Sequence, residues 1–211
     1  MTGEKISIHS PGGKSFDETR SVDTPDLRLA KLTAPTLPSQ IGILRDRLVN
    51  AFHEFEIGGE AAHAHSCMAI EEALANAIYH GNLELDSDLK ETGAEQFSDL
   101  AKERCVQVPW KDRTVEVTEL ATPFGVWITI RDQGPGFDVT AAMERTIDPE
   151  ALLASGRGLV MMRAFADDLV FNSTGNEVTL VFYGRKNVDV KELLKARAAS
   201  RNGSRQSHSV V

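Results

Sequence analysis

The sequence lacks the features that hold together small secreted or metal-stabilised domains. It contains only two cysteines, Cys67 and Cys105, in 211 residues. Two cysteines exclude a disulfide framework and a four-cysteine zinc site, although they leave a single bridge open. No run of about 18 apolar residues occurs, so we expect no membrane-spanning helix. The N-terminus, MTGEKISIHSPGGKSFDETR, lacks the apolar middle of a signal peptide, which predicts a soluble, cytoplasmic protein.

Basic residues are also scarce relative to acidic ones. The chain has 23 lysines and arginines against 31 aspartates and glutamates, a formal net charge of −8. Binding to a phosphate backbone needs a basic surface, so nucleic acid is not an expected partner. Hydrophobic residues make up 41% of the chain and charged residues 26%, which is ordinary for a globular protein. One folded domain with extensions is therefore expected.

Both ends of the chain lack a hydrophobic period. Residues 1–25 are rich in Ser, Gly, Thr and charged residues, and they predict a flexible N-terminal arm. Residues 186–211 begin with a short helical pattern and then become polar, and they carry six basic and two acidic residues. This segment predicts a basic flexible tail that is solvated, with docking to a partner as the alternative. The folded domain is accordingly placed at 26–185.

Between the two ends, hydrophobic residues alternate between a period of two, typical of strands, and a helical period. Consecutive strands joined by short turns indicate hairpins. The pattern therefore predicts an α+β two-layer sandwich, a mostly antiparallel mixed β-sheet covered on one face by helices. The expected strands are 27–33, 114–122, 126–131, 169–172 and 178–183. The expected helices are one capped by Ser39 and ending at Gly58, one over 60–80, a charged helical insertion over about 84–107 with a break near Gly93, a short one within 138–157, and one over 159–166.

The helix over 60–80 has two distinct faces. An apolar stripe faces the expected sheet and contains Cys67, Ile70, Leu74 and Ile78. A polar stripe on the opposite side contains Glu72, Asn76 and His80. This stripe could be an ordinary solvated face. However, Glu72 and Asn76 are four residues apart and point at one spot, where a carboxylate can polarise a hydroxyl and an amide oxygen can bind Mg²⁺.

A glycine-rich turn follows the expected strand VWITI. Its pattern is Asp132-x-Gly134-x-Gly136, and Asp, Gly and Pro favour turns for purely structural reasons. The functional alternative places the Asp132 carboxylate at the end of a buried strand. There it could accept a hydrogen bond from an exocyclic amine such as that of adenine, and the glycines would let a flat base approach the backbone.

A second glycine pair opens the helix that starts near Leu159. Gly156-Arg157-Gly158 precedes this helix, so free backbone N–H groups and the positive end of the helix dipole would point toward an anion. No Gly-Lys-Ser/Thr follows, which excludes a P-loop.

Taken in order, the segments EALANAIYHGN, DQGPGF and SGRGL resemble the N, G1 and G2 boxes of the GHKL ATPase superfamily. The resemblance covers about residues 27–184 and is closest to the bacterial anti-sigma-factor serine kinases. It implies the Bergerat ATP-binding fold, with ATP and Mg²⁺ as cofactors. The implied roles are Glu72 as general base, Asn76 as Mg²⁺ ligand, Asp132 as adenine anchor, Gly134 and Gly136 along the base, and Gly156 and Gly158 under the phosphates. Arg157 and Leu159 fall inside the G2 box, residues 138–155 match a short ATP lid, and His80 closes the helix of the N box.

The same resemblance implies an ATP-dependent protein serine/threonine kinase. Such a protein binds a sigma factor or an anti-anti-sigma partner and phosphorylates a serine of the latter, with a homodimer as an open oligomeric state. Two departures favour an ATP-gated partner switch without transfer. Ala154-Ser155 stands where some of these kinases have an arginine, and Asn176-Glu177 replaces a common Thr-Thr. A histidine-kinase catalytic domain is the third reading, but His53 lies only 23 residues before Asn76, which leaves no room for a dimerising hairpin.

Overall fold

The computed structural model of the protein describes residues 4–8, 16–86, 89, 93–145 and 157–184. Seven strands form one sheet in the order β1-β2-β3-β4-β5-β7-β6, and each pair of neighbours is antiparallel. The strands are β1 (Glu4–Ile8), β2 (Phe16–Thr24), β3 (Leu27–Pro35), β4 (Thr114–Thr122), β5 (Gly125–Arg131), β6 (Asp168–Phe171) and β7 (Glu177–Tyr183). The helices are α1 (Gln40–Glu54), α2 (Glu60–Ala75), the π-helix η1 (Asn76–Asn82), α4 (Ala94–Arg104), the short 3-10 helix η2 (Trp110–Asp112), α5 (Val139–Arg145) and α6 (Arg157–Phe165).

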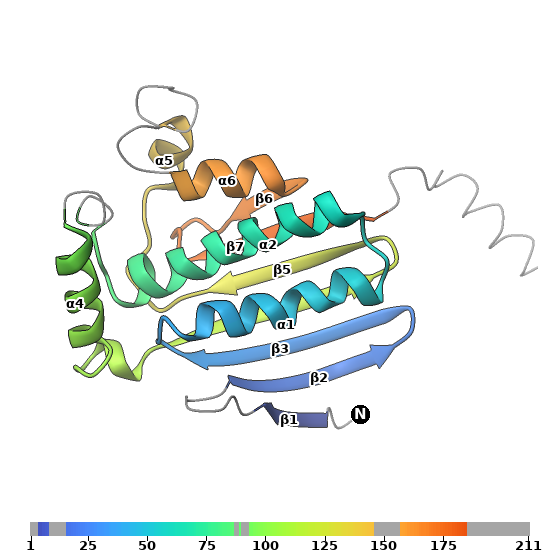
Figure 1. Ribbon diagram of the computed structural model, residues 1–211, viewed down its shortest axis with the longest axis horizontal. Coiled ribbons are helices and arrows are strands. Elements are labelled where there is room, and N and C mark those ends of the chain that lie inside the picture. The colour runs from blue at the N-terminus through green and yellow to red at the C-terminus, as the bar shows by residue number, and fades with distance from the viewer. Residues whose placement is uncertain (1–3, 9–15, 87–88, 90–92, 146–156, 185–211) are drawn as a thin grey trace, which may run out of the picture.

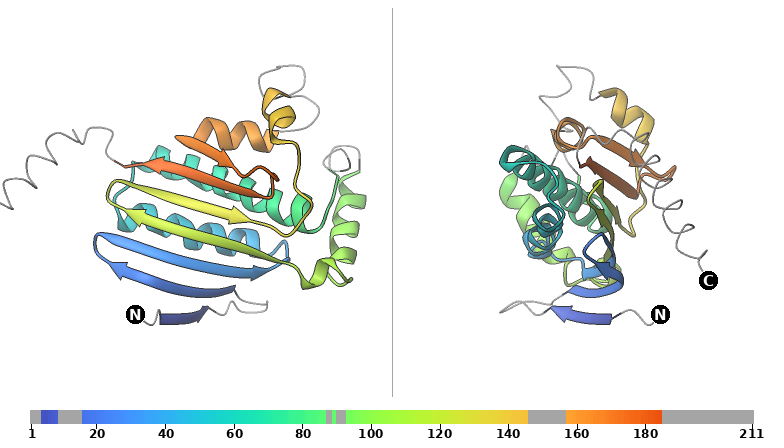
Figure 2. Two further views of the ribbon diagram at one scale, coloured as in Figure 1. Left: turned by 180° about the vertical axis from the view of Figure 1, so that it is seen from behind. Right: turned by 90° about the vertical axis from the view of Figure 1, so that its right-hand side faces the viewer.

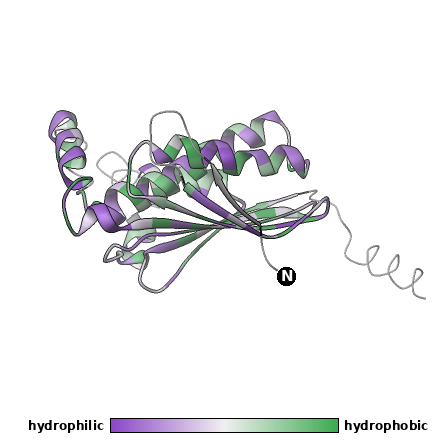
Figure 3. Ribbon diagram, turned by 90° about the horizontal axis from the view of Figure 1, so that it is seen from below, coloured by the Kyte–Doolittle hydropathy of each residue, from purple (hydrophilic) through white to green (hydrophobic). Residues whose placement is uncertain are grey.

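The helices α1, α2 and α6 lie on one face of the sheet, and Figure 1 views the molecule from that side. Figure 2 shows the opposite face, which none of the helices among the described residues covers. Figure 3 shows the same two layers from below, with hydrophilic and hydrophobic residues interspersed along the ribbons. The α+β two-layer sandwich is thus confirmed, although the sheet is wholly antiparallel in its described pairings rather than mixed.

The expected flexible arm is wrong for residues 16–24, which form strand β2. This strand pairs with β3 along its length and carries the buried Phe16. Its sequence, FDETRSVDT, hid the alternation because a second inward position is occupied by the charged Glu18 rather than by an apolar residue. Strand β1 was missed as well, and the basic tail over 186–211 lies outside the described residues.

The helix expected over 60–80 is correct in position but differs in its last turn. The α-helix ends at Ala75, and the chain continues as the π-helix η1 to Asn82. The expected core residues Ile70, Leu74 and Ile78 are fully buried, so the apolar stripe faces the sheet as predicted. Helix α6 packs on α2 from another side. Short π-helical segments within α-helices are frequent at functional sites.

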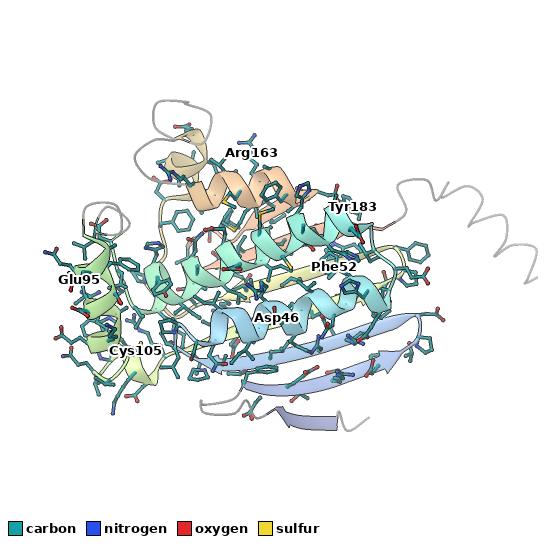
Figure 4. The ribbon with its side chains drawn as sticks, viewed as in Figure 1. Asp46, Phe52, Glu95, Cys105, Arg163 and Tyr183 are labelled. Carbon is teal, nitrogen blue, oxygen red and sulfur yellow. The ribbon has the colours of Figure 1, made fainter. Side chains whose placement is uncertain are left out.

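Two other expectations are partly confirmed. The charged insertion contains α4, which begins after Gly93, but residues 84–86 before it are not helical and Glu84 has a positive φ of 52°. The short helix expected within 138–157 is α5, while residues 146–156 lie outside the described part of the chain. Cys105 lies at the end of α4 (Figure 4), and both cysteines are free thiols. No helix among the described residues is both long and apolar enough to cross a lipid bilayer.

A buried ion cluster joins β2 to α1 and β4. Arg47 of α1 donates hydrogen bonds to Glu18 at 2.5 and 3.0 Å and to Glu119 at 3.1 and 3.2 Å. Both glutamates are 0% exposed. Burial alone would raise the pKa of Glu18, but the hydrogen bonds from Arg47 and Arg20 outweigh it and lower that pKa. Arg47 therefore links β2 to α1 and β4, in addition to the backbone pairing of β2 with β3.

We predict that Arg47→Met lowers the free energy of unfolding by about 3–5 kcal/mol, because it removes the cation that two buried carboxylates share and leaves them only Arg20 and the more distant Arg28. Arg45→Met is the matched control. Arg45 lies on the same helix and pairs with Asp46 and Glu71, which are exposed, so its loss should cost about 1 kcal/mol or less. Urea unfolding of both variants measures the difference. Equal losses would show that the buried cluster does not hold β2.

Candidate functional site

A cavity of about 890 Å³ lies between α2, η1, α6 and the end of β5. This volume is within the range of small-molecule sites. The cavity wall brings together residues that the sequence separates by more than 80 positions. The sequence-predicted residues that line it are Glu72, Asn76, His80, Asp132, Gly136, Arg157, Gly158 and Leu159. Gly156 lies outside the described residues.

The polar stripe faces this cavity rather than bulk water. Glu72 and Asn76 are half-buried on the side of the helix where α6 approaches. A Cβ added to Gly158 would lie 2.8 Å from Oε2 of Glu72 and 3.5 Å from the side-chain amide of Asn76. Gly158 at the beginning of α6 therefore lies against the stripe, and a side chain at residue 158 would displace the Glu72 carboxylate.

His80 lines the cavity. Its Nδ1 lies 2.7 Å from the carbonyl oxygen of Leu85, in the segment that follows η1. The ring also lies near Phe97 of α4, at 6.3 Å between centroids. His80 thus joins the cavity wall to the charged insertion.

Asp132 is the most deeply buried acidic group of the cavity, with 8% of its surface exposed. Its Oδ1 accepts a hydrogen bond of 2.8 Å from the backbone N–H of Gly134. Burial raises the pKa of Asp132 from 3.8 to about 6, and the Gly134 N–H and the positive charge of Arg113 offset this only in part. A carboxylate in this condition is stabilised by any ligand that donates a hydrogen bond to it.

Two glycines allow the Asp132 side chain to lie where it does. A Cβ on Gly81 would lie 2.3 Å from Cγ of Asp132, and a Cβ on Gly134 would lie 2.2 Å from the carbonyl oxygen of Gly81. The end of η1 and the turn after β5 are therefore in direct backbone contact. Gly134 was expected to line the base, but it packs on Gly81 and is not part of the cavity wall.

Gly136 does line the cavity, and it has a second requirement for glycine. Its φ is +76°, in the left-handed region, and a Cβ there would lie 2.0 Å from the carbonyl oxygen of Thr174. The turn after β5 and the turn before β7 are thus packed against each other at this position.

Sequence reasoning missed the apolar wall of the cavity. Ile130, Met162 and Val178 are buried residues of this wall, and they come from β5, α6 and β7. Met162 could have been found from its place three residues after Leu159 on the same helix. The other two belong to strands whose inward positions were predicted only as core.

Asn176 is a further residue that the sequence did not mark as part of the site. Its carbonyl oxygen accepts a hydrogen bond of 3.0 Å from the N–H of Asp132, and its Nδ2 donates to the Asp132 carbonyl oxygen at 3.4 Å. Its Oδ1 accepts from Asn172 at 2.8 Å. The turn before β7 therefore bonds to both the N–H and the carbonyl oxygen of Asp132.

The oxygen atoms of Glu72 and Asn76 suit Mg²⁺ better than they suit a transition metal. The described residues contain no group of three or more His, Cys, Asp or Glu side chains placed to hold a metal ion. Mg²⁺ usually keeps phosphate and water ligands and takes only one or two from the protein. Asn76 beside the start of α6 fits that pattern, because phosphates would lie at the same place.

The comparisons with known proteins agree with this geometry. The sequence model of the histidine kinase-like ATPase domain matches residues 34–182, a span that includes the whole cavity wall. A search of curated proteins finds no match to the chain. The family match covers more than half of the chain and contains all three boxes in their expected order. The chain therefore belongs to the histidine kinase-like ATPase domain family and is an ATP-binding module of the GHKL superfamily.

Proposed function

We propose that this ATP-binding module is a protein serine/threonine kinase of the anti-sigma-factor type. It binds Mg·ATP in the cavity and phosphorylates a serine of an anti-anti-sigma partner, which alternates with a sigma factor on its surface. The observation that carries this proposal is the contact between Gly158 and the stripe of Glu72 and Asn76. It places a carboxylate, an amide oxygen and a helix N-terminus at one point.

The adenine end of the site is assigned to Asp132. Its buried carboxylate would accept a hydrogen bond from the exocyclic amine of the base. The base itself would pack on the apolar wall made by Ile130, Met162 and Val178. Gly136, which also lines the cavity, leaves room for the flat ring system.

The phosphate end is assigned to the start of α6 and to Asn76. Backbone N–H groups at a helix start attract anions, and the dipole of the helix adds to the attraction. Arg157 is exposed at this end and can add a positive charge near the mouth of the cavity. Mg²⁺ bound at Asn76 would neutralise phosphate charge as it develops during transfer.

Glu72 is assigned as the general base. It lies one helical turn before Asn76 and contacts the same glycine, so its carboxylate can orient the seryl hydroxyl of the partner and take its proton. Positioned general bases contribute about 10²–10⁴-fold to a rate.

The second candidate is an ATP-gated partner switch that does not transfer phosphate. Asn176 favours it, because this residue stands where a Thr-Thr pair is common in the kinases. Its side chain is already hydrogen-bonded to Asn172 and to the backbone of Asp132. The third, a histidine-kinase catalytic domain, is disfavoured. His53 lies at the end of α1, which packs on the sheet, and its ring contacts His63 at 4.1 Å between centroids.

The assignment of Asp132 predicts a specific dependence of ATP affinity on pH. The pKa of Asp132 in the free protein is about 6, and the ionised form is the one that accepts the amine. Affinity should therefore be constant above about pH 7 and fall as the pH drops through 6, by up to about tenfold per pH unit. Calorimetry with Mg·ATP between about pH 7.5 and 5 measures it. In Asp132→Asn the affinity should be lower throughout and this pH dependence lost. A wild-type profile that parallels the variant's would argue against Asp132 as the anchor.

Substitutions at Glu72 and Asn76 should affect phosphate transfer and Mg·ATP binding differently. Asn76→Ala removes a Mg²⁺ ligand, so we expect weaker Mg·ATP binding. Glu72→Gln keeps the shape but loses the base, so binding should be nearly unchanged while phosphate transfer falls about 10²–10⁴-fold. Partners are first recovered by pull-down with and without ATP, and their phosphoserines are mapped. Phosphate incorporation into the recovered partner then measures transfer.

The neighbouring Glu71→Gln is the matched control for Glu72→Gln. Glu71 is exposed and pairs with Arg45 outside the cavity, so transfer should be unaffected. If wild type releases one partner for another with ATP but phosphorylates neither, the partner-switch candidate replaces the kinase. Equal losses of thermal stability in Glu72→Gln and Asn76→Ala would instead show that the stripe is structural.

A further inference from the structure

We propose that Asn82, the last residue of η1, is a positioning residue that sets the adenine anchor Asp132 and thereby the preference for adenine. The proposal rests on the ATP-binding function proposed above. Asn82 is 0% exposed and does not line the cavity, so it would act through the turn after β5 and not by touching the nucleotide.

The side-chain amide of Asn82 is satisfied on both sides. Its Oδ1 accepts a hydrogen bond of 2.7 Å from the N–H of Gln133. Its Nδ2 donates to Oγ1 of Thr36 at 2.9 Å and to the carbonyl oxygen of Thr114 at 3.1 Å. A backbone N–H can only donate and a backbone carbonyl can only accept, so these two partners determine which way the amide points. One side chain thus connects the end of β3, the start of β4 and the turn after β5.

The hydrogen bond to Gln133 acts on the residue that directly follows the anchor. Asp132 is held on its N-terminal side by the carbonyl oxygen of Asn176. On its C-terminal side, Asn82 holds the N–H of Gln133, and the next N–H, of Gly134, bonds to the Asp132 carboxylate. The turn is also tethered by the Thr114 N–H, which bonds to Gln133 Oε1 at 2.7 Å. Loss of the Asn82 amide would remove the side-chain bond to the turn backbone between Asp132 and Gly134, where the turn orients that carboxylate.

The residue before Asn82, Gly81, leaves the space that the Asp132 carboxylate occupies. Gly81 has no side chain, and the Asp132 carboxylate occupies the space where a Cβ would be. Arg113, whose charge acts on Asp132, donates a hydrogen bond of 2.7 Å to the backbone carbonyl of Asn82. Residue 81 therefore supplies the space for the carboxylate, and residue 82 holds the turn whose Gly134 N–H bonds to it. A side chain that binds a ligand must be held within about 0.5 Å of its productive position.

The phosphate contacts lie at the other end of the cavity, on Asn76 and α6. A loosened anchor should therefore weaken recognition of the base and leave phosphate binding in place. We expect Asn82→Ala to reduce Mg·ATP affinity by about tenfold or more while the affinities for Mg·GTP and Mg·tripolyphosphate change little. A purely structural role would lower all three affinities together.

Thr36→Val is the matched control. It removes one partner of the Asn82 amide but retains the bonds to Thr114 and Gln133, so stability should fall while the ratio of ATP to GTP affinity is kept. Asn82→Asp is the conservative variant. It keeps an oxygen acceptor for the Gln133 N–H, so it should retain much more of the ATP preference than Asn82→Ala.

Hydrogen exchange of the Gln133 amide gives a readout that needs no nucleotide. In Asn82→Ala this amide should lose its protection, whereas in Thr36→Val it should keep it. If wild type binds no ATP but the exchange result holds, the proposed function is wrong and the positioning of the turn by Asn82 stands. If the ATP to GTP ratio is the same in wild type and Asn82→Ala, or the Gln133 amide stays protected, the proposal is overturned.

Should Asn82→Ala fail to fold, the exposed Gln133 offers a second pair of variants. Gln133→Pro removes the N–H that Asn82 binds, whereas Gln133→Ala keeps it. Both variants lose the bond from the Thr114 N–H to Gln133 Oε1, so that loss is matched between them. The ATP preference should fall in the first and persist in the second. Equal preference in the two variants would overturn the proposal.

Discussion

The burial of one carboxylate, that of Asp132, is the constraint on which the site depends. A buried carboxylate is costly unless hydrogen-bond donors surround it. The fold supplies the N–H of Gly134 and the more distant charge of Arg113, and the pKa of Asp132 nevertheless rises to about 6. The space for the carboxylate exists because residue 81 is glycine. The free protein thus holds a carboxyl group whose ionised form would be stabilised by a ligand that donates a hydrogen bond to it.

A second buried carboxylate shows what the same fold does when charge serves stability. Glu18 is 0% exposed, but Arg47 and Arg20 bond to it directly and lower its pKa. Asp132 lies in a cavity and its pKa is raised, whereas Glu18 lies in the core between sheet and helix. Burial also raises the pKa of Glu119 in the same ion cluster, despite its hydrogen bonds from Arg47, so a raised pKa is not confined to the site. Asp132 differs from both glutamates because it lines a cavity that a ligand can enter.

The sequence predicted those parts of the protein in which local pattern reflects local environment. The hairpin of β4 and β5 alternates cleanly, and the two faces of α2 separate apolar from polar residues, so both were predicted correctly. Strand β2 was missed because its inward Glu18 is neutralised by Arg47, a residue 29 positions away. The contacts of Gly158 with Glu72 and of Gly81 with Asp132 were equally invisible, since a glycine shows only that space is needed and not what fills it.

One nucleotide should span the cavity, with adenine at Asp132 and the phosphates near Asn76. A crystal structure with Mg²⁺ and a non-hydrolysable ATP analogue would show this arrangement. We expect the exocyclic amine to lie within hydrogen-bonding distance of the Asp132 carboxylate, Mg²⁺ to bind Oδ1 of Asn76, and the phosphates to lie at the start of α6. A nucleotide bound in the reverse direction, or a metal ion held away from Asn76, would contradict it.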